Sequence, residues 1–285
     1  MHGDQPTNEL VRAFPDPALR RFVKAYHGYC QRGVPPGRHR GLPSPFLTVI
    51  FTFDEPLHIA QHVDRRQAPG SYLTLAGGLH TVPALISHNG TQCGIQLEMS
   101  PLGARALLGM PAGELAGIDL DGTEVFGKLA AETTECLAQA RSWPERFAIL
   151  DCMLRRALRG DQTVPDEISH AWQCLLRSRG SMPVAQLVRE IGWSDRHLAS
   201  RFRTDIGLTS KAAARVIRFH HARRVLQTNG VVGLADVAAS CGYNDQSHLV
   251  RDFVQFAGCP PSTRVRDEFG NFQAILAADE QCCDS

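Results

Sequence analysis

One short phrase occurs twice in the C-terminal third of the chain, and it limits the possible folds more than any other feature. The first copy is GWSDRHLASRF (192–202) and the second is GYNDQSHLVRDF (242–253), so the unit recurs after about 50 residues. An amphipathic stretch precedes each glycine and another follows it. Glycine permits a sharp turn between helices, and Ser194 or Asn244 caps the next helix by accepting a hydrogen bond from an unpaired amide. The repeat therefore predicts two helix-turn-helix motifs.

The helical period predicts which side chains of each second helix are exposed. Leu198 and Phe202 in the first copy, and the matching Leu249 and Phe253 in the second, are expected to point into the core. The opposite faces carry side chains that suit the edges of DNA bases. Arginine can form hydrogen bonds with guanine, a hydroxyl group can do so with several bases, and a small apolar group can contact the methyl group of thymine. The outward positions are Arg196, Ala199, Ser200 and Arg203 in the first copy and Ser247, Val250, Arg251 and Val254 in the second, and Gln246 lies in the first turn of the second helix. Phosphate contacts, which position a protein without reading sequence, are predicted from Ser194, Arg203, Lys211, Asn244 and His248.

A long helix is predicted between the two motifs. The segment SKAAARVIRFHHARRVLQT, residues 210–228, corresponds to roughly 28 Å of helix at 1.5 Å per residue. Successive major grooves on one side of B-DNA lie about 34 Å apart. A rigid connector of this length can hold two helices in adjacent grooves of one duplex. An interaction surface for another protein is the alternative use of the same exposed faces.

The pattern of the whole chain predicts an α+β protein, in which a β-rich N-terminal domain precedes an all-α C-terminal domain. Short β-type runs occur at 46–53, 71–78 and 93–99, and the last alternates between Cys93, Ile95, Leu97 and Met99 on one face and polar or small residues on the other. Helices are expected at 101–108, 125–141 and 144–159, and then at 166–178, 183–191, 195–206, 210–228, 234–241, 245–257 and 261–267. The segment GDQTVPDE, 160–167, is the best candidate for a linker.

Composition is compatible with a nucleic-acid partner but does not require one. The 285 residues carry a formal net charge of +1, yet Pro165 to Gly270 contains 14 Lys and Arg against 10 Asp and Glu, a balance of +4 that leaves −3 elsewhere. No apolar run approaches the roughly 20 residues of a membrane span, and no export signal is visible, so we expect no membrane association and an intracellular location.

The C-terminal third resembles the AraC/XylS family of bacterial transcription regulators. The likeness runs from Ala171 to Asp267 and is carried by LADVAASCGYNDQSHLVRDF with the Gly-Cys-Pro-Pro of 258–261, by IGWSDRHLASRFRTDIGLTSKA and by RVIRFHHARRVL. Ser210 and Arg264 depart from the usual Pro and Tyr of the family. The resemblance implies double-stranded DNA as partner, with the second helix of each motif in the major groove. By matching positions, it implies base contacts from Arg196, Ala199, Ser200, Gln246, Ser247, Val250 and Arg251. It also implies transcription regulation at the nucleoid in the bacterial cytoplasm, with activation and contact to RNA polymerase as the expectation.

The N-terminal half resembles, more weakly, the sensor region of actinobacterial members of this family, through PALRRFVKAYHGY and CGIQLEMSPLGARALLGMP. This resemblance implies a small-molecule effector and a homodimer. The predicted domains are 1–122, a β-rich regulatory, effector or dimerisation domain; 123–165, a helical connector and linker; 166–270, the AraC-type DNA-binding domain; and 271–285, a tail.

Catalysis and cofactors are not expected. No phosphate-binding loop, nucleophile elbow or zinc-protease motif is present, so we predict no catalytic residue and no cofactor. The nine cysteines show no zinc-type spacing, and no metal site is predicted; we expect reduced thiols, with Cys282 and Cys283 open to oxidation in the tail. A non-catalytic adaptor, or a redox or ligand sensor acting through protein contacts, remains the alternative function.

Overall fold

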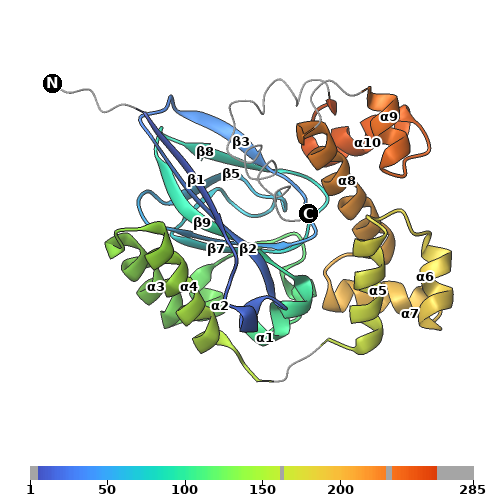
Figure 1. Ribbon diagram of the computed structural model, residues 1–285, viewed down its shortest axis with the longest axis horizontal. Coiled ribbons are helices and arrows are strands. Elements are labelled where there is room, and N and C mark those ends of the chain that lie inside the picture. Colours follow the sequence, from blue (N-terminus) through green and yellow to red (C-terminus); the bar gives the residue numbers. More distant parts are fainter. Residues whose placement is uncertain (1–5, 161–163, 229–232, 262–285) are drawn as a thin grey trace.

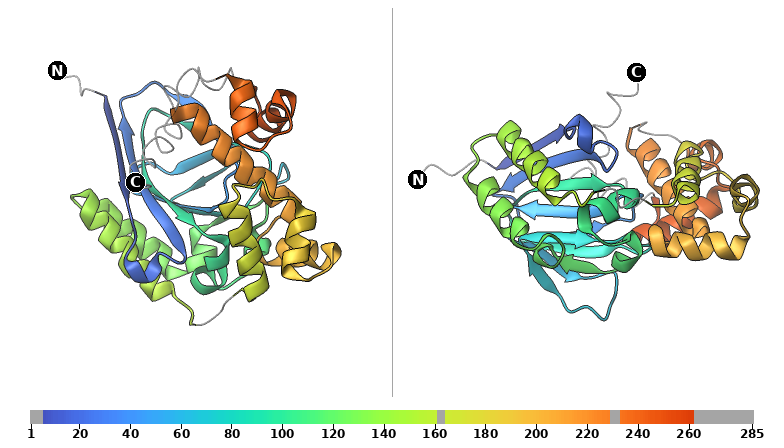
Figure 2. Two further views of the ribbon diagram at one scale, coloured as in Figure 1. Left: turned by 45° about the vertical axis from the view of Figure 1, so that its right-hand side comes forward. Right: turned by 90° about the horizontal axis from the view of Figure 1, so that it is seen from below.

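The structure, a computed structural model, describes residues 6–160, 164–228 and 233–261 of the chain. Strands dominate its first part and helices make up its last part, so the predicted α+β class is confirmed (Figure 1). The helical part lies beside the β-rich part (Figure 2). Within the described residues, every helix is too short or too polar to cross a membrane.

Two antiparallel sheets form the N-terminal part. The larger has the strand order β1-β2-β9-β4-β7-β10 and the smaller β3-β8-β5-β6. The strands are β1 Thr7–Ala13, β2 Val23–Arg32, β3 Gly37–Gly41, β4 Leu47–Thr52, β5 Leu57–Gln61, β6 Gly70–Tyr72, β7 Thr74–Gly77, β8 Ala84–His88, β9 Gln92–Met99 and β10 Asp119–Asp121. The central pairs, β2 with β9 and β9 with β4, join segments distant in sequence.

Alternation along β4 and β9 gives the larger sheet two different faces. Ile95 and Leu97 are fully buried against helices on the outer face, whereas Gln96 and Glu98 point to the space between the sheets. This confirms the predicted buried face of the 93–99 strand. In β4, Phe51 packs on the outer side and Ile50 on the inner side, where it meets apolar residues of the smaller sheet. Each sheet therefore has one face available to enclose a cavity.

Helices cover the outer face of the larger sheet. They are α1 Ala104–Leu108, α2 Gly122–Phe126, α3 Lys128–Gln139 and α4 Trp143–Ala157 (Figure 1). The rings of Phe147 and Tyr26 stack at 5.9 Å, and Phe126 lies 6.1 Å from Phe51. Residues 123–165, predicted as a connector, thus contribute α3 and α4 to the packing of this sheet. The domain boundaries themselves stay a prediction.

Two predicted elements are divided in the structure. The helix expected at 125–141 is interrupted at Gly127, whose φ of 58° is outside the helical region and separates α2 from α3. The strand expected at 71–78 becomes β6 and β7, which belong to different sheets and meet at Leu73. The amide of Thr52 donates to the carbonyl of Leu73 at 2.8 Å, which fixes this corner.

The helix predicted at 101–108 is present, and its first three residues form a 3₁₀ turn. The hydroxyl of Ser100 accepts from the Leu102 amide, and a 3₁₀ turn, Pro101–Gly103, leads into α1. Gly109 ends α1 with a φ of 74°, the left-handed conformation that glycine adopts without strain.

The C-terminal part contains only helices among its described residues. They are α5 Asp166–Arg177, α6 Val184–Ile191, α7 Asp195–Asp205, α8 Ser210–Thr228, α9 Leu234–Ser240 and α10 Gln246–Ala257. These bounds agree with the predicted helices to within two residues. The helix expected at 261–267 falls almost wholly outside the described residues, as do Arg264 and the predicted tail.

Buried apolar side chains are continuous from the first part to the second. One cluster includes Phe147 of α4, Trp172 of α5 and Phe202 of α7. A separate cluster around Phe219 and Phe253 fills the second motif. The first motif is therefore packed together with the N-terminal part, while the second has its own core on α8.

Candidate nucleic-acid interface

The first motif consists of α6, a tight turn and α7. Gly192 ends α6 with a φ of 77°, and the Ser194 hydroxyl accepts from the His197 amide at 3.2 Å, as the sequence predicts. Leu198 and Phe202 of α7 are fully buried. The opposite side of α7 is consequently directed outward.

The second motif, α9 and α10, has the same plan but a different cap from the predicted one. Asp245, one residue after Asn244, accepts from the His248 amide at 2.6 Å and caps α10. The prediction of Asn244 as the cap was wrong because the second copy contains one extra residue between its glycine and its helix. Gly242 has the expected positive φ of 73°, and Leu249 and Phe253 are buried.

Helix α8 holds both motifs. It is 19 residues long and runs between them, with α7 near one end and α10 near the other (Figure 1). Arg218 donates to the carbonyl of Gly180, in the turn before α6, at 2.7 Å. Arg215 forms an ion pair at 2.6 Å with the buried Asp252 of α10. Because both arginines lie on one helix, the two motifs are fixed to a common support.

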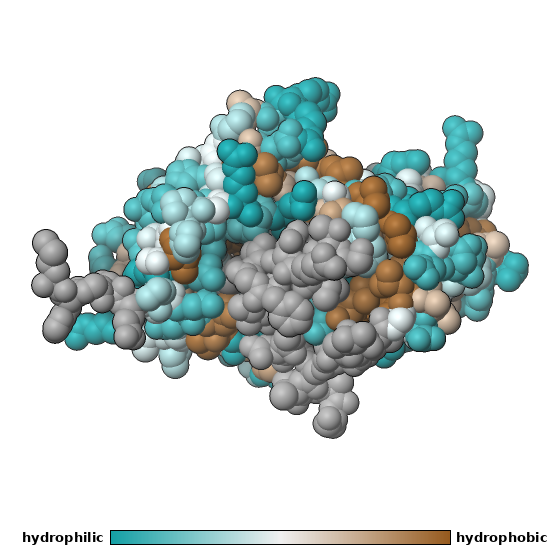
Figure 3. All heavy atoms as spheres, turned by 90° about the horizontal axis from the view of Figure 1, so that it is seen from above, coloured by the Kyte–Doolittle hydropathy of each residue, from teal (hydrophilic) through white to brown (hydrophobic). Residues whose placement is uncertain are grey.

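The predicted base-contacting residues lie on the outer sides of α7 and α10. Arg196, Ser200, Gln246, Ser247 and Arg251 are exposed, whereas Ala199 and Val250 are half-buried. The Nε of Arg251 donates to the carbonyl of Ser247 at 3.3 Å, one turn earlier. Val254 adds an apolar side chain, 48% exposed, to the same helix. The surface seen from above is mainly hydrophilic with separate hydrophobic patches (Figure 3).

Most of the residues predicted to contact phosphate are also accessible. Ser194, Arg203, Lys211 and Asn244 are exposed. In the described part of the chain, no hydrogen bond or ion pair engages the side chains of Arg196, Arg203 or Lys211. The ring of His248 is half-buried and meets that of Tyr243 edge to face at 5.1 Å. The roles of these residues stay predictions.

The C-terminal ends of both exposed helices touch the N-terminal part, which the sequence did not indicate. Asp205, the last residue of α7, is fully buried and accepts from Arg105 of α1 at 2.7 Å. A side chain at Gly113 would meet the carbonyl of Arg203 at 2.3 Å, so glycine permits the close approach. Gly258, after α10, lies near the guanidinium of Arg40. No local pattern reveals such contacts between distant segments.

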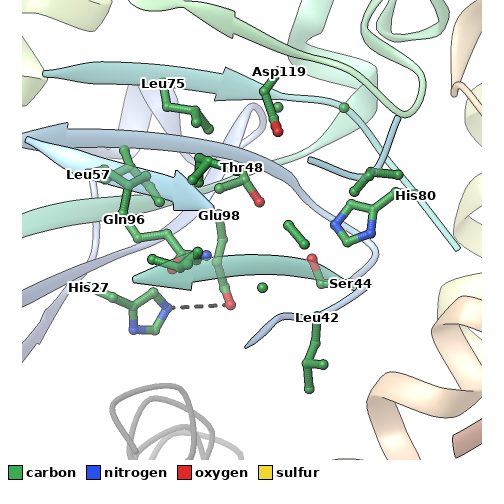
Figure 4. A pocket seen from close by; sticks show the side chains of 18 of the residues that line it. His27, Leu42, Ser44, Thr48, Leu57, Leu75, His80, Gln96, Glu98 and Asp119 are labelled. Atoms are coloured by element: carbon green, nitrogen blue, oxygen red, sulfur yellow. Dashed lines mark ion pairs between the residues drawn. The ribbon is translucent and has the colours of Figure 1, made fainter. Parts of the chain in front are cut away.

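A cavity of about 90 Å³ lies between the two sheets (Figure 4). Ile50, Leu57 and Leu75 line it with apolar groups, and Thr48, Gln96 and Glu98 add polar ones. His27 faces Glu98, with 3.4 Å between Nε2 and Oε1. No local pattern in the sequence indicates that strands far apart in the chain bring these groups together.

Helix α8 supplies part of the cavity wall. His220 and Arg223 of this helix line the cavity together with the strands. The Nδ1 atom of His220 is buried and has no hydrogen-bond partner among the residues that the structure describes. Burial and the charge of Arg223 lower the pKa of His220 to about 3, so the imidazole is neutral. One helix therefore contacts the cavity and both helix-turn-helix motifs.

Comparison with known families assigns the helical part. A helix-turn-helix domain family matches residues 187–266, which include both motifs and α8. This match covers less than half of the chain, and it supports the helix-turn-helix domain that the sequence predicts. The N-terminal part, 11–121, matches a domain family of unknown function, DUF6597.

Curated relatives with a partial match to the chain are transcriptional activators. The HTH-type transcriptional activator RhaR of Escherichia coli O139:H28 is 26% identical over 168 residues, which are 56% of this chain. RhaR of Shigella boydii serotype 4 matches to the same extent. The chain spans 59% of the length of these relatives.

Solved structures of ToxT from Vibrio cholerae share the fold. The apo form of a ToxT variant has a TM-score of 0.51 at 11% identity, over 85% of this chain and 97% of ToxT. Wild-type ToxT bound to an unsaturated fatty acid has a TM-score of 0.48 at 11% identity, over 84% of this chain and 94% of that one. At this identity the likeness concerns the fold alone.

Proposed function

We propose that this chain is a transcription regulator of the AraC/XylS type. It activates transcription by inserting α7 and α10 into adjacent major grooves of one DNA duplex. The attachment of both motifs to α8 carries the proposal, through Arg218 on one side and Arg215 on the other. A helix of 19 residues is roughly 28 Å long, close to the 34 Å between successive grooves. In this arrangement Arg196 and Arg251 read guanine, and Lys211 and Arg203 contact phosphates.

The N-terminal part regulates this activity through its cavity. Small-molecule sites typically measure about 300 to 1,000 Å³, and the cavity of about 90 Å³ is smaller. An effector of ordinary size must therefore displace part of the wall. The strands are fixed by their sheets, whereas His220 and Arg223 belong to α8. A ligand that displaces α8 moves the support of both reading helices, which couples effector binding to DNA binding.

The same proposal includes a homodimer in the bacterial cytoplasm, at the nucleoid, that contacts RNA polymerase. RhaR, which is 26% identical over 168 residues, is named a transcriptional activator, and this supports activation here. Two chains would place four reading helices on a promoter, and the spacing of half-sites would reflect the symmetry of the dimer.

Selection of bound DNA from a random pool, followed by footprinting, tests the proposal. We expect one preferred site per chain, with two protected major grooves about one helical turn apart. Affinity for that site should exceed affinity for a scrambled duplex by at least about 1,000-fold, and both should weaken with salt. A chain with no sequence preference would favour the adaptor function instead.

A further inference from the structure

A cluster of three potential metal ligands lies on the surface between α5 and α6. His170 and Cys174 are four residues apart on α5, so their side chains share one face of the helix. Glu190 reaches them from α6. The donor atoms of the three side chains all lie within 4.8 Å of one another. None of these residues belongs to the proposed DNA-contacting faces or to the cavity.

The distances between the donor atoms match those of a tetrahedral zinc site. Nε2 of His170 lies 3.0 Å from Oε1 of Glu190. Sγ of Cys174 lies 3.6 Å from the same nitrogen and 3.4 Å from the same oxygen. With Zn–S of about 2.3 Å and Zn–N or Zn–O of about 2.0 to 2.1 Å, a tetrahedron has edges of roughly 3.4 to 3.6 Å. Only the edge between His170 and Glu190 must lengthen, by about 0.4 Å on this geometry.

The chemistry and the access of the cluster also suit zinc. Thiolate, imidazole and carboxylate are its usual protein ligands, and three of them leave a fourth position for water. Cys174 is buried at the base of the cluster, whereas His170 and Glu190 are 48% and 38% exposed, which gives the ion a route from solvent. A thiolate and a carboxylate together balance the charge of one divalent ion.

We infer that His170, Cys174 and Glu190 form a zinc-binding site that joins α5 to α6. In the absence of an ion, the carboxylate accepts from both the imidazole and the thiol, and these bonds keep the three ligands close together. Because α6 is the first helix of the first motif, zinc would stabilise that motif against local unfolding. The binding site is independent of the proposed DNA contacts.

The positive charge of the neighbouring Arg177 side chain repels an incoming zinc ion. Nη2 of Arg177 donates to Sγ of Cys174 at 3.4 Å, and its side chain is exposed, so it can turn into solvent when zinc enters. Replacing Arg177 by Ala should therefore leave zinc affinity unchanged or raise it. A loss of binding in Arg177→Ala would contradict this geometry.

Titration of the metal-free full chain, with its Cys30–Cys93 disulfide intact, with Zn²⁺ and Co²⁺ tests the inference. We expect one ion per chain, a thiolate-to-cobalt charge-transfer band, and a higher Tm in the presence of zinc. Glu190→Gln and His170→Gln keep the size of exposed side chains, and each should weaken binding by at least the tenfold typical of disturbed metal sites. Cys174→Ser should abolish the charge-transfer band.

Matched cysteine variants distinguish this site from adventitious thiols. Cys136 and Cys152 are exposed and distant in sequence, and Cys282 with Cys283 offers adjacent thiols in the tail. Serine at these four positions should leave stoichiometry and affinity unchanged. The inference would be overturned if the parent chain bound no zinc. It would also be overturned if the control variants lost zinc binding while Glu190→Gln kept it. Metal binding and Tm are both measured without DNA, so a failure of this inference is distinguishable from a failure of the proposed function.

Discussion

Nη2 of Arg105 lies 2.7 Å from Oδ1 of Asp205 and joins α1 of the N-terminal part to the end of α7. Asp205 is fully buried and also pairs with Arg201 of its own helix at 3.0 Å. A buried carboxylate requires such partners, since its desolvation is otherwise uncompensated. This ion pair therefore determines how α7 rests on the N-terminal part.

Replacing Arg105 by Ala should lower the free energy of unfolding by about 1 to 3 kcal/mol, because Asp205 keeps only Arg201 as a charged partner. Urea denaturation measures the loss. Arg66→Ala is the control, since that arginine is 90% exposed and pairs only within its own turn; it should unfold like the parent. Equal behaviour of the two variants would show that the contact with α1 contributes nothing.

Phe253→Ala should destabilise the second motif by about 3 to 5 kcal/mol through the cavity it leaves. The ring is buried and lies 4.9 Å from that of Phe219 on α8. Val254→Ala, the next residue and 48% exposed, is the matched control and should change stability by less than about 0.5 kcal/mol. Thermal melts of both variants test the orientation of α10. A Tm for Phe253→Ala equal to that of the parent chain would contradict the assignment of Phe253 to the buried face of this helix.

Arg251→Ala should weaken binding to the preferred DNA site by about 1 to 3 kcal/mol and remove the preference at one base pair. Arg203→Ala should instead weaken binding to all sequences. Because one phosphate contact is lost, the slope of log affinity against log salt concentration should fall in magnitude by about 1. Titrations of selected and mismatched duplexes at several salt concentrations separate the two effects. A uniform loss for Arg251→Ala would make that residue a phosphate contact.

Stability should fall as the solution is acidified below about pH 6.5, and His220 is one cause. Burial holds its pKa at about 3 in the folded protein, below the ordinary value of 6.5. Between these values the unfolded chain binds a proton that the folded chain does not, so stability is present above pH 6.5 and is lost as the pH falls toward 3. Burial lowers the pKa of His221 as well.

The Tm of the parent and of His220→Asn, measured from pH 7.5 down to 4.5, tests this linkage. Asparagine is similar in shape near the backbone but does not titrate, so the variant should lose less stability on acidification. His221 leaves a residual slope in both proteins. Parallel curves would assign the acid sensitivity to other groups.

Reduction should remove a disulfide that the sequence did not predict. Cys30 and Cys93 are bonded in the structure, contrary to the expectation of reduced thiols. They face one another on β2 and β9, in a register that no local pattern specifies. The bond closes a loop of 63 residues, and such bonds typically stabilise by about 2 to 4 kcal/mol.

Thiol labelling before and after reduction counts the bonded cysteines, and denaturation in both states measures the stabilisation. Cys93→Ala should reproduce the reduced protein and become insensitive to reductant, whereas Cys136→Ser, at an exposed free thiol, should respond like the parent. Labelling of Cys30 in the unreduced parent would show that the bond does not form in solution.

The helical part followed closely from local patterns. Helix periods, Gly192 and Gly242 at the turns, and the Ser194 cap specify two motifs because each depends on residues within a few positions of one another. The failure at Asn244 was also local, since Asp245 competes for the same role one residue later. Burial of Leu198 and Phe253 agrees with the predicted orientation of the two reading helices.

By itself the sequence determined the α+β order of elements and the two helix-turn-helix units, because hydrogen bonds within helices and turns involve near neighbours. Tertiary structure alone decided the strand order, the Cys30–Cys93 bond, the placement of His220 beside the cavity, and the pairing of Arg105 with Asp205. Each of these joins residues separated by tens of positions or more. Which distant partners meet depends on how whole sheets and helices pack, and no short segment contains that information.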